Sequence, residues 1–162
     1  EWPHWLADYL ELAYLLCYPL VPIGVGVLCL LRLRPFIDEY WTVVLPASYL
    51  CYLTTAFSHT LPPRMLPTTR EFRPGKPRRF NLWILGQASI GANTFPSAHV
   101  AASMGASFVI LSHDLPAGLV FLWLSCSIAA GAVVGRYHYL ADALAGATVA
   151  GAVFVLIRYG PW

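Results

Sequence analysis

The hydrophobic residues of this chain come in long unbroken runs, without the stripes of an amphipathic soluble domain. A bilayer core about 30 Å thick takes about 20 helical residues to cross. The stretches that meet this length are approximately Leu10–Leu31, Trp41–Leu61, Pro96–Leu111, Pro116–Val134 and Tyr139–Ile157. The pattern predicts an all-α integral membrane helical bundle with five transmembrane helices. It also predicts that residues 1–162 form a single transmembrane domain.

Composition agrees with this interpretation. Hydrophobic residues make up 58% of the 162 positions and charged residues only 11%, whereas soluble domains carry about 25% charged residues. The net charge of +2 gives no reason to expect a nucleic acid partner. The four cysteines lie inside apolar runs without metal-ligand spacing, so neither a disulfide framework nor a zinc site is expected. The partners expected from the sequence are membrane lipids. The sequence does not predict the oligomeric state.

The positive charge is concentrated in one long connection, residues 63–94. Six of the ten Lys and Arg residues lie there, namely Arg64, Arg70, Arg73, Lys76, Arg78 and Arg79. The first of them, Arg64, directly follows the second apolar run and is a candidate phosphate-binding residue, with Arg70 and Arg73 behind it. Basic residues next to a membrane also attract anionic lipid headgroups. We expect headgroup contact from the last three cations.

A second polar cluster, Asn93-Thr94-Phe95-Pro96-Ser97-Ala98-His99, opens the third apolar run. Proline favours the first turn of a helix, and Asn or Thr before it can cap that turn. Ser97 and His99 are therefore expected in the first turn, where free backbone N–H groups attract anions. A hydroxyl and an imidazole there suit phosphate binding and proton donation. The simpler alternative is a capped helix start with an interfacial histidine.

The third cluster, Gly135 to Asp142, opens the fifth run. His138 and Asp142 are four residues apart, so on a helix they share a face. A carboxylate that accepts from one imidazole nitrogen fixes the tautomer and leaves the other nitrogen as a base or nucleophile. Arg136 adds a planar cation that matches phosphate oxygens. The alternative is an ion pair that only pins two helices together.

With alternating spans, all three clusters face the same side of the membrane. Two histidines, an aspartate, a serine and converging arginines form a constellation suited to phosphoryl transfer. No carboxylate cluster is present in the sequence to hold magnesium. The prediction is therefore a metal-independent enzyme without a cofactor, acting on a lipid phosphate.

Two of these motifs resemble those of the type 2 phosphatidic acid phosphatase (PAP2) superfamily. Pro96-Ser97-Ala98-His99 is similar to its second motif, and His138-Tyr139-Leu140-Ala141-Asp142, with Gly146 trailing, is similar to the core of its third. The resemblance implies a core of six helices, the first of them missing before Glu1. It also implies an active site on the extracytoplasmic or luminal side, although the positive-inside rule alone would place it in the cytoplasm.

The resemblance also implies roles for individual residues. His138 is the nucleophile that forms a phosphohistidine, and Asp142 orients it. His99 protonates the leaving oxygen. Ser97 and Arg136 hold phosphate oxygens, and Arg136 stands in for a family arginine whose position is Ala132 here.

The first family motif, Lys-x6-Arg-Pro, is absent. Pro62-Pro63-Arg64 and Asn93 instead resemble the branch that includes inositol phosphotransferases, which makes Asn93 a further phosphate-binding candidate. The predicted function is hydrolysis of a lipid phosphate or diphosphate monoester, with lipid headgroup phosphotransfer as the alternative. A remote alternative from another class is a metal- or haem-binding membrane module that uses His99 and His138.

Overall fold

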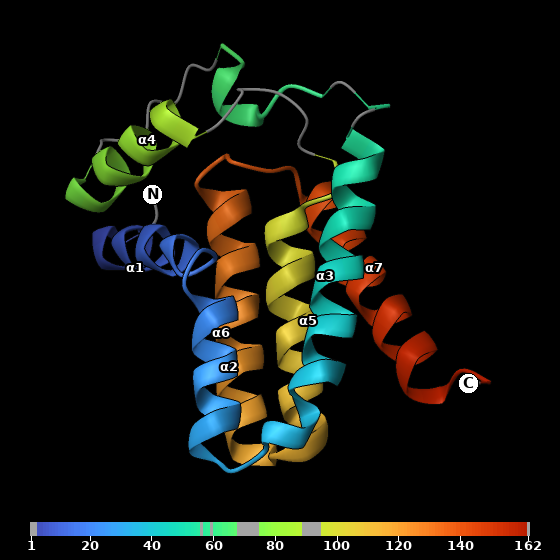
Figure 1. Cartoon of the computed structure of the whole chain (residues 1–162). Helices are drawn as coiled ribbons and strands as arrows, with labels where there is room; N and C mark the ends of the chain where they lie inside the picture. Colours follow the sequence, from blue (N-terminus) through green and yellow to red (C-terminus); the bar gives the residue numbers. More distant parts are fainter. Residues whose placement is uncertain (1–2, 56, 59, 68–74, 89–94, 162) are drawn as a thin grey trace.

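The computed structural model describes residues 3–55, 57–58, 60–67, 75–88 and 95–161. Within these ranges the chain is helical and contains no strand, which confirms the predicted fold class. The longer helices are α1 (His4–Leu15), α2 (Leu20–Leu30), α3 (Ile37–Thr55), α4 (Lys76–Ala88), α5 (Ala98–His113), α6 (Leu115–Val134) and α7 (Leu140–Tyr159), with short 3-10 turns η1 (Arg34–Phe36) and η2 (Pro63–Met65). Figure 1 shows α2, α3, α5 and α6 side by side as a bundle, with α1 and α4 across its upper end.

The first apolar run is broken, which corrects the prediction of one span over Leu10–Leu31. α1 and α2 meet at an angle of 73° across a short break. Pro19 lies in this break as the residue before α2, and a proline there removes an N–H donor and clashes with the preceding turn. As a result, α1 lies across the end of the bundle while α2 runs along it (Figure 1).

Three of the other four apolar runs match their helices to within about two residues at each end, and the run that became α3 is shifted toward the N-terminus. α6 and α7 are each long and apolar enough to cross a membrane, and α1 with α2 makes a third candidate if the bent pair is one span. α3 begins at Ile37 with two acidic residues in its first turn and ends at Thr55, before the predicted Leu61. α5 is a shorter apolar helix of 16 residues. By length and composition, the described residues thus hold two or three candidate spans where five were predicted.

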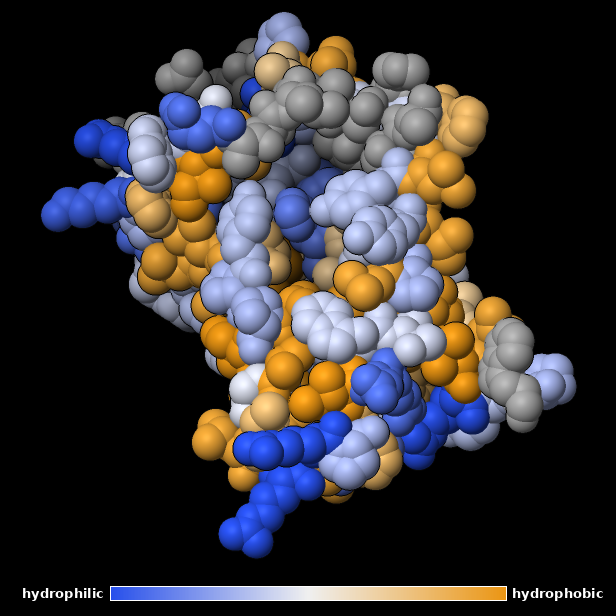
Figure 2. Space-filling model, in the orientation of Figure 1, coloured by the Kyte–Doolittle hydropathy of each residue, from blue (hydrophilic) through white to orange (hydrophobic). Residues whose placement is uncertain are grey.

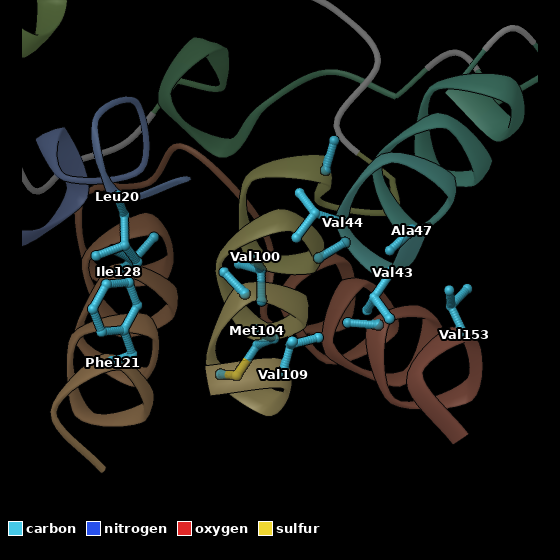
Figure 3. Close-up of a cluster of buried hydrophobic side chains, with 14 of the residues drawn as sticks. Leu20, Val43, Val44, Ala47, Val100, Met104, Val109, Phe121, Ile128 and Val153 are labelled. Carbon is cyan, nitrogen blue, oxygen red and sulfur yellow. The ribbon is translucent and has the colours of Figure 1, made fainter. Parts of the chain in front are cut away.

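α5 is the central helix, and it packs against α6, α3, α7 and α2. Figure 3 shows members of the buried hydrophobic cluster on α5 and on the helices around it. The labelled members are Val100, Met104 and Val109 on α5, Phe121 and Ile128 on α6, Leu20 on α2, Val43, Val44 and Ala47 on α3, and Val153 on α7. A polar seam adds to this core, because the Ser107 and Ser125 hydroxyls bond each other at 2.8 Å. Such hydrogen bonds hold helices together where no water is present.

The outer surface is strongly apolar in the middle of the molecule. Exposed large hydrophobic residues include Leu119, Val120, Trp123, Leu144, Val155 and Leu156 on α6 and α7. In Figure 2 the middle of the visible face is mostly hydrophobic, hydrophilic side chains gather toward the ends, and a hollow with hydrophilic atoms at its base opens near the upper end. Soluble monomers rarely expose apolar patches of this kind, so the surface is that of a membrane-embedded bundle.

Candidate active site

Three segments that are distant in the sequence meet at the upper end of the bundle (Figure 1). They are the start of α5, the start of α7 with the connection before it, and the turn η2. The backbone N–H of Ser97 donates to the carbonyl oxygen of Asp142 at 2.9 Å, and that of Arg64 donates to the carbonyl oxygen of Arg136 at 2.9 Å. Backbone hydrogen bonds therefore join all three polar clusters that were identified in the sequence.

His99 and His138 face each other at this end. Their ring centroids are 6.2 Å apart, and the ring planes stand at 78°. His99 lies in the first turn of α5, as predicted, while His138 lies in the connection before α7. Both side chains are partly buried, so the two imidazoles form a semi-enclosed pair.

Asp142 is the partner of His138, as predicted. The two residues do not share a helix face, however, because His138 lies before α7 begins. The Nδ1 atom of His138 is 3.4 Å from Oδ2 of Asp142. α7 begins only at Leu140, and Asp142 reaches back from its first turn to accept the Tyr139 N–H at 2.8 Å. A carboxylate is favoured in the first turn of a helix because it satisfies the unpaired N–H groups. Asp142 thus caps α7 and lies within ion-pair distance of Nδ1 of His138.

Ser97 begins α5 as its N-cap. Its hydroxyl accepts the Val100 N–H at 3.4 Å, and the residue is fully buried. The sequence predicted Asn93 or Thr94 as the capping residue, and this is wrong because Ser97 caps the helix. Gly146 makes the close approach possible, because a Cβ atom at this position would overlap the carbonyl oxygen of Ser97.

Arg136 and Arg64 have different surroundings. Arg136 has a φ of 63°, a left-handed conformation that is uncommon for a residue with a side chain. Its Nη2 donates to the Pro63 carbonyl oxygen at 2.5 Å, with a longer contact of 3.5 Å to Leu66. The Arg136 guanidinium thus holds η2 in place. Arg64, within η2, has its guanidinium carbon 6.0 Å from the centre of the Tyr137 ring.

An aromatic wall that sequence reasoning missed surrounds His99. Tyr14 and Tyr18 place their rings edge-on to it, with centroids at 6.2 and 5.5 Å. Tyr14 also stacks on Tyr137 at 4.2 Å and 11°. Both Tyr14 and Tyr18 lie in the first apolar run, where a tyrosine gives no signal of its own. The bend after α1 is what brings them to the histidine.

The remaining predicted residues divide into two groups. Arg70, Arg73 and Asn93 lie outside the described residues. Arg78 was expected to contact lipid headgroups, but its Nη1 pairs with Oε1 of Glu11 at 2.6 Å, and its side chain is 12% exposed. Arg79, its neighbour, is exposed on α4. Only the second of these two arginines is thus placed as expected.

The site brings together ionisable side chains and helix N-termini. Among the residues described, no group of three or more His, Cys, Asp or Glu is arranged to hold a metal ion. The site combines an imidazole oriented by a carboxylate, a facing imidazole, a nearby guanidinium and the N-terminal ends of two helices. These groups suit an anionic ligand, a nucleophilic attack and a proton transfer.

Comparisons with known proteins agree with the motifs. A family model of the PAP2 superfamily matches residues 3–156, which is nearly the whole chain. Neither curated proteins nor solved structures gave a significant match. The match contains the helices, the histidine pair and the turns that carry both arginines. The chain therefore belongs to the PAP2 superfamily.

Proposed function

We propose that this chain is a membrane lipid phosphatase that hydrolyses a lipid phosphate or diphosphate monoester through a phosphohistidine at His138. Membership of the PAP2 superfamily supports a phosphatase-type activity in general. The apolar helices support a location in the membrane. The lipid substrate, the intermediate and the absence of a metal requirement are our proposals.

The observation that carries the proposal is the facing pair His99 and His138, with Asp142 on one side only. The ring centroids are 6.2 Å apart, close enough for one phosphate group to touch both rings. Asp142 lies near Nδ1 of His138 at 3.4 Å, so Nε2 of His138 is the attacking atom. His99 is left as the proton donor. This asymmetry gives each histidine one role.

In the first step, Nε2 of His138 attacks the terminal phosphorus, and the bond from that phosphorus to the oxygen on the lipid side breaks. Protonated His99 gives its proton to that leaving oxygen, so a monophosphate substrate releases the lipid as a neutral alcohol and a diphosphate substrate releases the lipid monophosphate. Arg64 neutralises charge on the phosphoryl oxygens. Donors placed where charge develops are among the largest contributions to catalysis.

In the second step, water attacks the phosphohistidine. His99, now neutral, takes a proton from the water as its oxygen bonds to phosphorus. The bond between phosphorus and Nε2 breaks, and inorganic phosphate leaves with His138 restored. Asp142 stabilises the positive imidazole in both steps.

Purified protein in mixed micelles, supplied with a chelator, tests the proposal against phosphatidate, sphingoid phosphates, phosphatidylglycerol phosphate and polyprenyl diphosphates. We expect phosphate release from at least one lipid without added metal. Rapid quenching with a labelled substrate should trap an acid-labile, base-stable phosphoenzyme. Absence of phosphate release from every lipid phosphate would sink the proposal, and activity only with stoichiometric metal would overturn its mechanism.

Headgroup transfer is the alternative, supported by the Pro62-Pro63-Arg64 segment. This segment resembles the inositol phosphotransferase branch, and its Arg64 is tied by its backbone to Arg136 at 2.9 Å. In that case an alcohol rather than water resolves the intermediate at His138. Phosphate release measured with and without inositol separates the two reactions. Release in the absence of any alcohol excludes an obligatory transferase.

We further propose that the site faces the extracytoplasmic or luminal side. In this orientation the cations at this end of the bundle bind a ligand, and the positive-inside rule does not apply to them. A short-chain, membrane-impermeant lipid phosphate supplied to intact cells tests the orientation. Hydrolysis outside the cells supports it, whereas hydrolysis only after permeabilisation reverses it.

A further inference from the structure

Glu11 is a buried acid inside the first apolar run, and the proposed chemistry does not use it. It is 6% exposed. Its Oε1 accepts from Arg78 Nη1 at 2.6 Å, and its Oε2 accepts from Asn81 Nδ2 at 2.6 Å and from the Tyr137 hydroxyl at 2.5 Å. We call these four residues the Glu11 cluster. A buried charge is costly unless it is paired and hydrogen-bonded, and Glu11 is satisfied on both oxygens.

The cluster joins three separate parts of the chain. Glu11 is on α1, Arg78 and Asn81 are on α4, and Tyr137 is in the connection between α6 and α7. Asn81 and Tyr137 are each 1% exposed. Asn81 also donates to the backbone carbonyl oxygen of Glu11 at 2.8 Å. The two helices that lie across the end of the bundle are thus fastened to the connection that carries His138.

Two hydrogen bonds of the Glu11 cluster involve the turn that precedes His138. Tyr137, which donates to Glu11, is the residue directly before His138. Arg78 Nη1 also donates to the Gly135 carbonyl oxygen at 3.0 Å. Between them lies Arg136 with its φ of 63°. Non-glycine residues keep such a conformation only where the surrounding structure holds it. The Glu11 cluster therefore binds the turn at Gly135 and at Tyr137, the residues on either side of Arg136.

Tyr137 also connects the cluster with the other histidine. Its ring stacks on Tyr14, and Tyr14 places its ring edge-on to His99. Burial, followed by the neighbouring Glu11 carboxylate, raises the pKa of Tyr137 well above its ordinary value. The hydroxyl therefore stays protonated and donates to Glu11 throughout the physiological pH range. Tyr137 thus connects Glu11 with His138, its neighbour in sequence, and through Tyr14 with His99.

We infer that Glu11 is a positioning residue, which holds the Gly135–His138 turn through Tyr137 and Arg78 so that His138 faces His99 in attacking geometry. The inference rests on the proposed function for its kinetic consequences. The placement of His138 can be measured without any activity. A merely structural role, fastening α1 and α4 to the bundle, is the competing explanation.

Tyr137→Phe is the sharpest probe, because it removes only the hydroxyl bonded to Glu11 and keeps the ring stacked on Tyr14. Tyr9→Phe is the matched control. It removes a hydroxyl that bonds Ser127 at 2.6 Å, also between α1 and a neighbouring helix but outside the Glu11 cluster. Glu11→Gln keeps the shape of the side chain and removes its charge. It is paired with Tyr137→Phe in a double-mutant cycle.

Two measurements decide the question. In the active enzyme, kcat should fall about 3- to 10-fold in Tyr137→Phe with KM unchanged, which is the rate equivalent of one hydrogen bond. Tyr9→Phe should leave kcat unchanged at a similar loss of thermal stability. The losses in the double variant should be less than additive, because both changes weaken the same connection. Equal kcat in Tyr137→Phe and Tyr9→Phe would overturn the inference.

The second measurement is the rate at which diethyl pyrocarbonate modifies each histidine, resolved by mass spectrometry. A loosened turn should raise the rate at His138 several-fold in Tyr137→Phe and in Glu11→Gln, with His113 as the internal reference. An unchanged rate at His138 overturns the inference, as does a parallel rise at His113. If the wild type releases no phosphate from any lipid phosphate, the proposed function fails, and this modification rate alone decides the positioning role.

Discussion

The two ends of the bundle each carry a histidine paired with a carboxylate, and the two pairs differ in almost every other respect. At the upper end, Nδ1 of His138 lies 3.4 Å from Asp142. At the lower end, Nε2 of His113 lies 2.7 Å from Glu39. By distance alone the lower pair is the stronger interaction.

The lower pair is closed. Glu39 also binds Arg158 at 3.0 Å, and the His113 ring stacks on Phe36 with centroids 3.6 Å apart. His113 and Arg158 lie in the last turns of α5 and α7, where the helix dipole favours cations. This group links α3, α5 and α7 and leaves its histidine enclosed between an acid and an aromatic ring.

The upper pair lies at the opposite ends of the same two helices. The N-termini of α5 and α7 favour anions, and a second histidine, His99, faces the first. The difference teaches that a histidine–carboxylate pair does not by itself make a site. The facing imidazole, the nearby Arg64 and the helix N-termini distinguish the upper end as the place for a phosphate.

The largest expected effect comes from replacing the histidine of each pair by alanine. His138→Ala should lower phosphate release by about 10⁴-fold or more, because it removes the nucleophile itself, and no phosphoenzyme should be trapped. His113→Ala should keep kcat within a few-fold and lower the free energy of unfolding by about 1 to 3 kcal/mol, through a buried hydrogen bond left unmade.

His99→Ala refines the same test. The phosphoenzyme should still form slowly, and faster with a substrate whose leaving group needs no proton. Rapid quenching of the three variants measures this directly. A phosphoenzyme that persists in His138→Ala but is lost in His99→Ala would reverse the two roles.

The carboxylates give the next largest contrast. Asp142→Asn should lower kcat by about 10²- to 10³-fold, because the imidazolium formed at His138 loses its stabilising charge. Glu39→Gln should leave kcat nearly unchanged and lower the thermal midpoint in detergent. Steady-state kinetics and thermal scans of both variants check the prediction. Comparable kinetic losses in the two variants would mean that the ends of the bundle are not functionally different.

The sequence predicted the helical membrane fold because run length and composition are local properties. It also predicted the pair His138 and Asp142, although for a different geometric reason, since His138 lies before the helix and Asp142 reaches back from its first turn. The bend between α1 and α2 was readable in principle from Pro19. Among the described residues, two or three of the five predicted spans are long and apolar enough to cross a membrane, because apolar content does not reveal where a helix breaks or ends.

The contacts that escaped prediction are long-range. Glu11 meets Tyr137 and Arg136 meets Pro63 across large sequence separations, and neither contact has a local pattern. Glu11 nevertheless carried a signal, since an acid inside an apolar run of a membrane protein usually has a partner or a function. Arg136 was predicted to bind phosphate directly, and this stays a prediction beside its observed contact with η2.

The arginines of the two ends offer a third contrast of intermediate size. Arg64→Ala should lower kcat/KM by about 10²-fold, on the scale of one donor aimed at developing charge. Arg158→Ala, at the lower end, should leave it within a few-fold. Arg136→Lys tests whether that residue holds η2 or binds phosphate. If it only holds η2, inorganic phosphate should inhibit Arg136→Lys and the wild type at similar concentrations.

The smallest effect concerns two glycines of α7, the helix that joins the two ends. A Cβ atom at Gly146 would overlap the Ser97 carbonyl oxygen, whereas at Gly151 it would meet only the Phe108 ring at 3.9 Å. Gly146→Ala must therefore push α7 away from the start of α5, at a cost of about 1 to 3 kcal/mol, as for other overpacked sites. Gly151→Ala gains helix propensity at no steric cost and should be neutral or slightly stabilising.

The kinetic consequence of Gly146→Ala follows from the bonds at that contact. The Ser97 N–H donates to the Asp142 carbonyl oxygen, so a shift between the two helices changes the distance from His99 on α5 to His138 before α7. We expect kcat to fall several-fold in Gly146→Ala and to stay at the wild-type value in Gly151→Ala. Thermal scans and kinetics of the two variants, made in the same detergent, measure both effects. A Gly146→Ala protein that is destabilised but fully active would show that the histidine pair tolerates a displacement of α7, and the upper end would then be less finely set than the facing rings suggest.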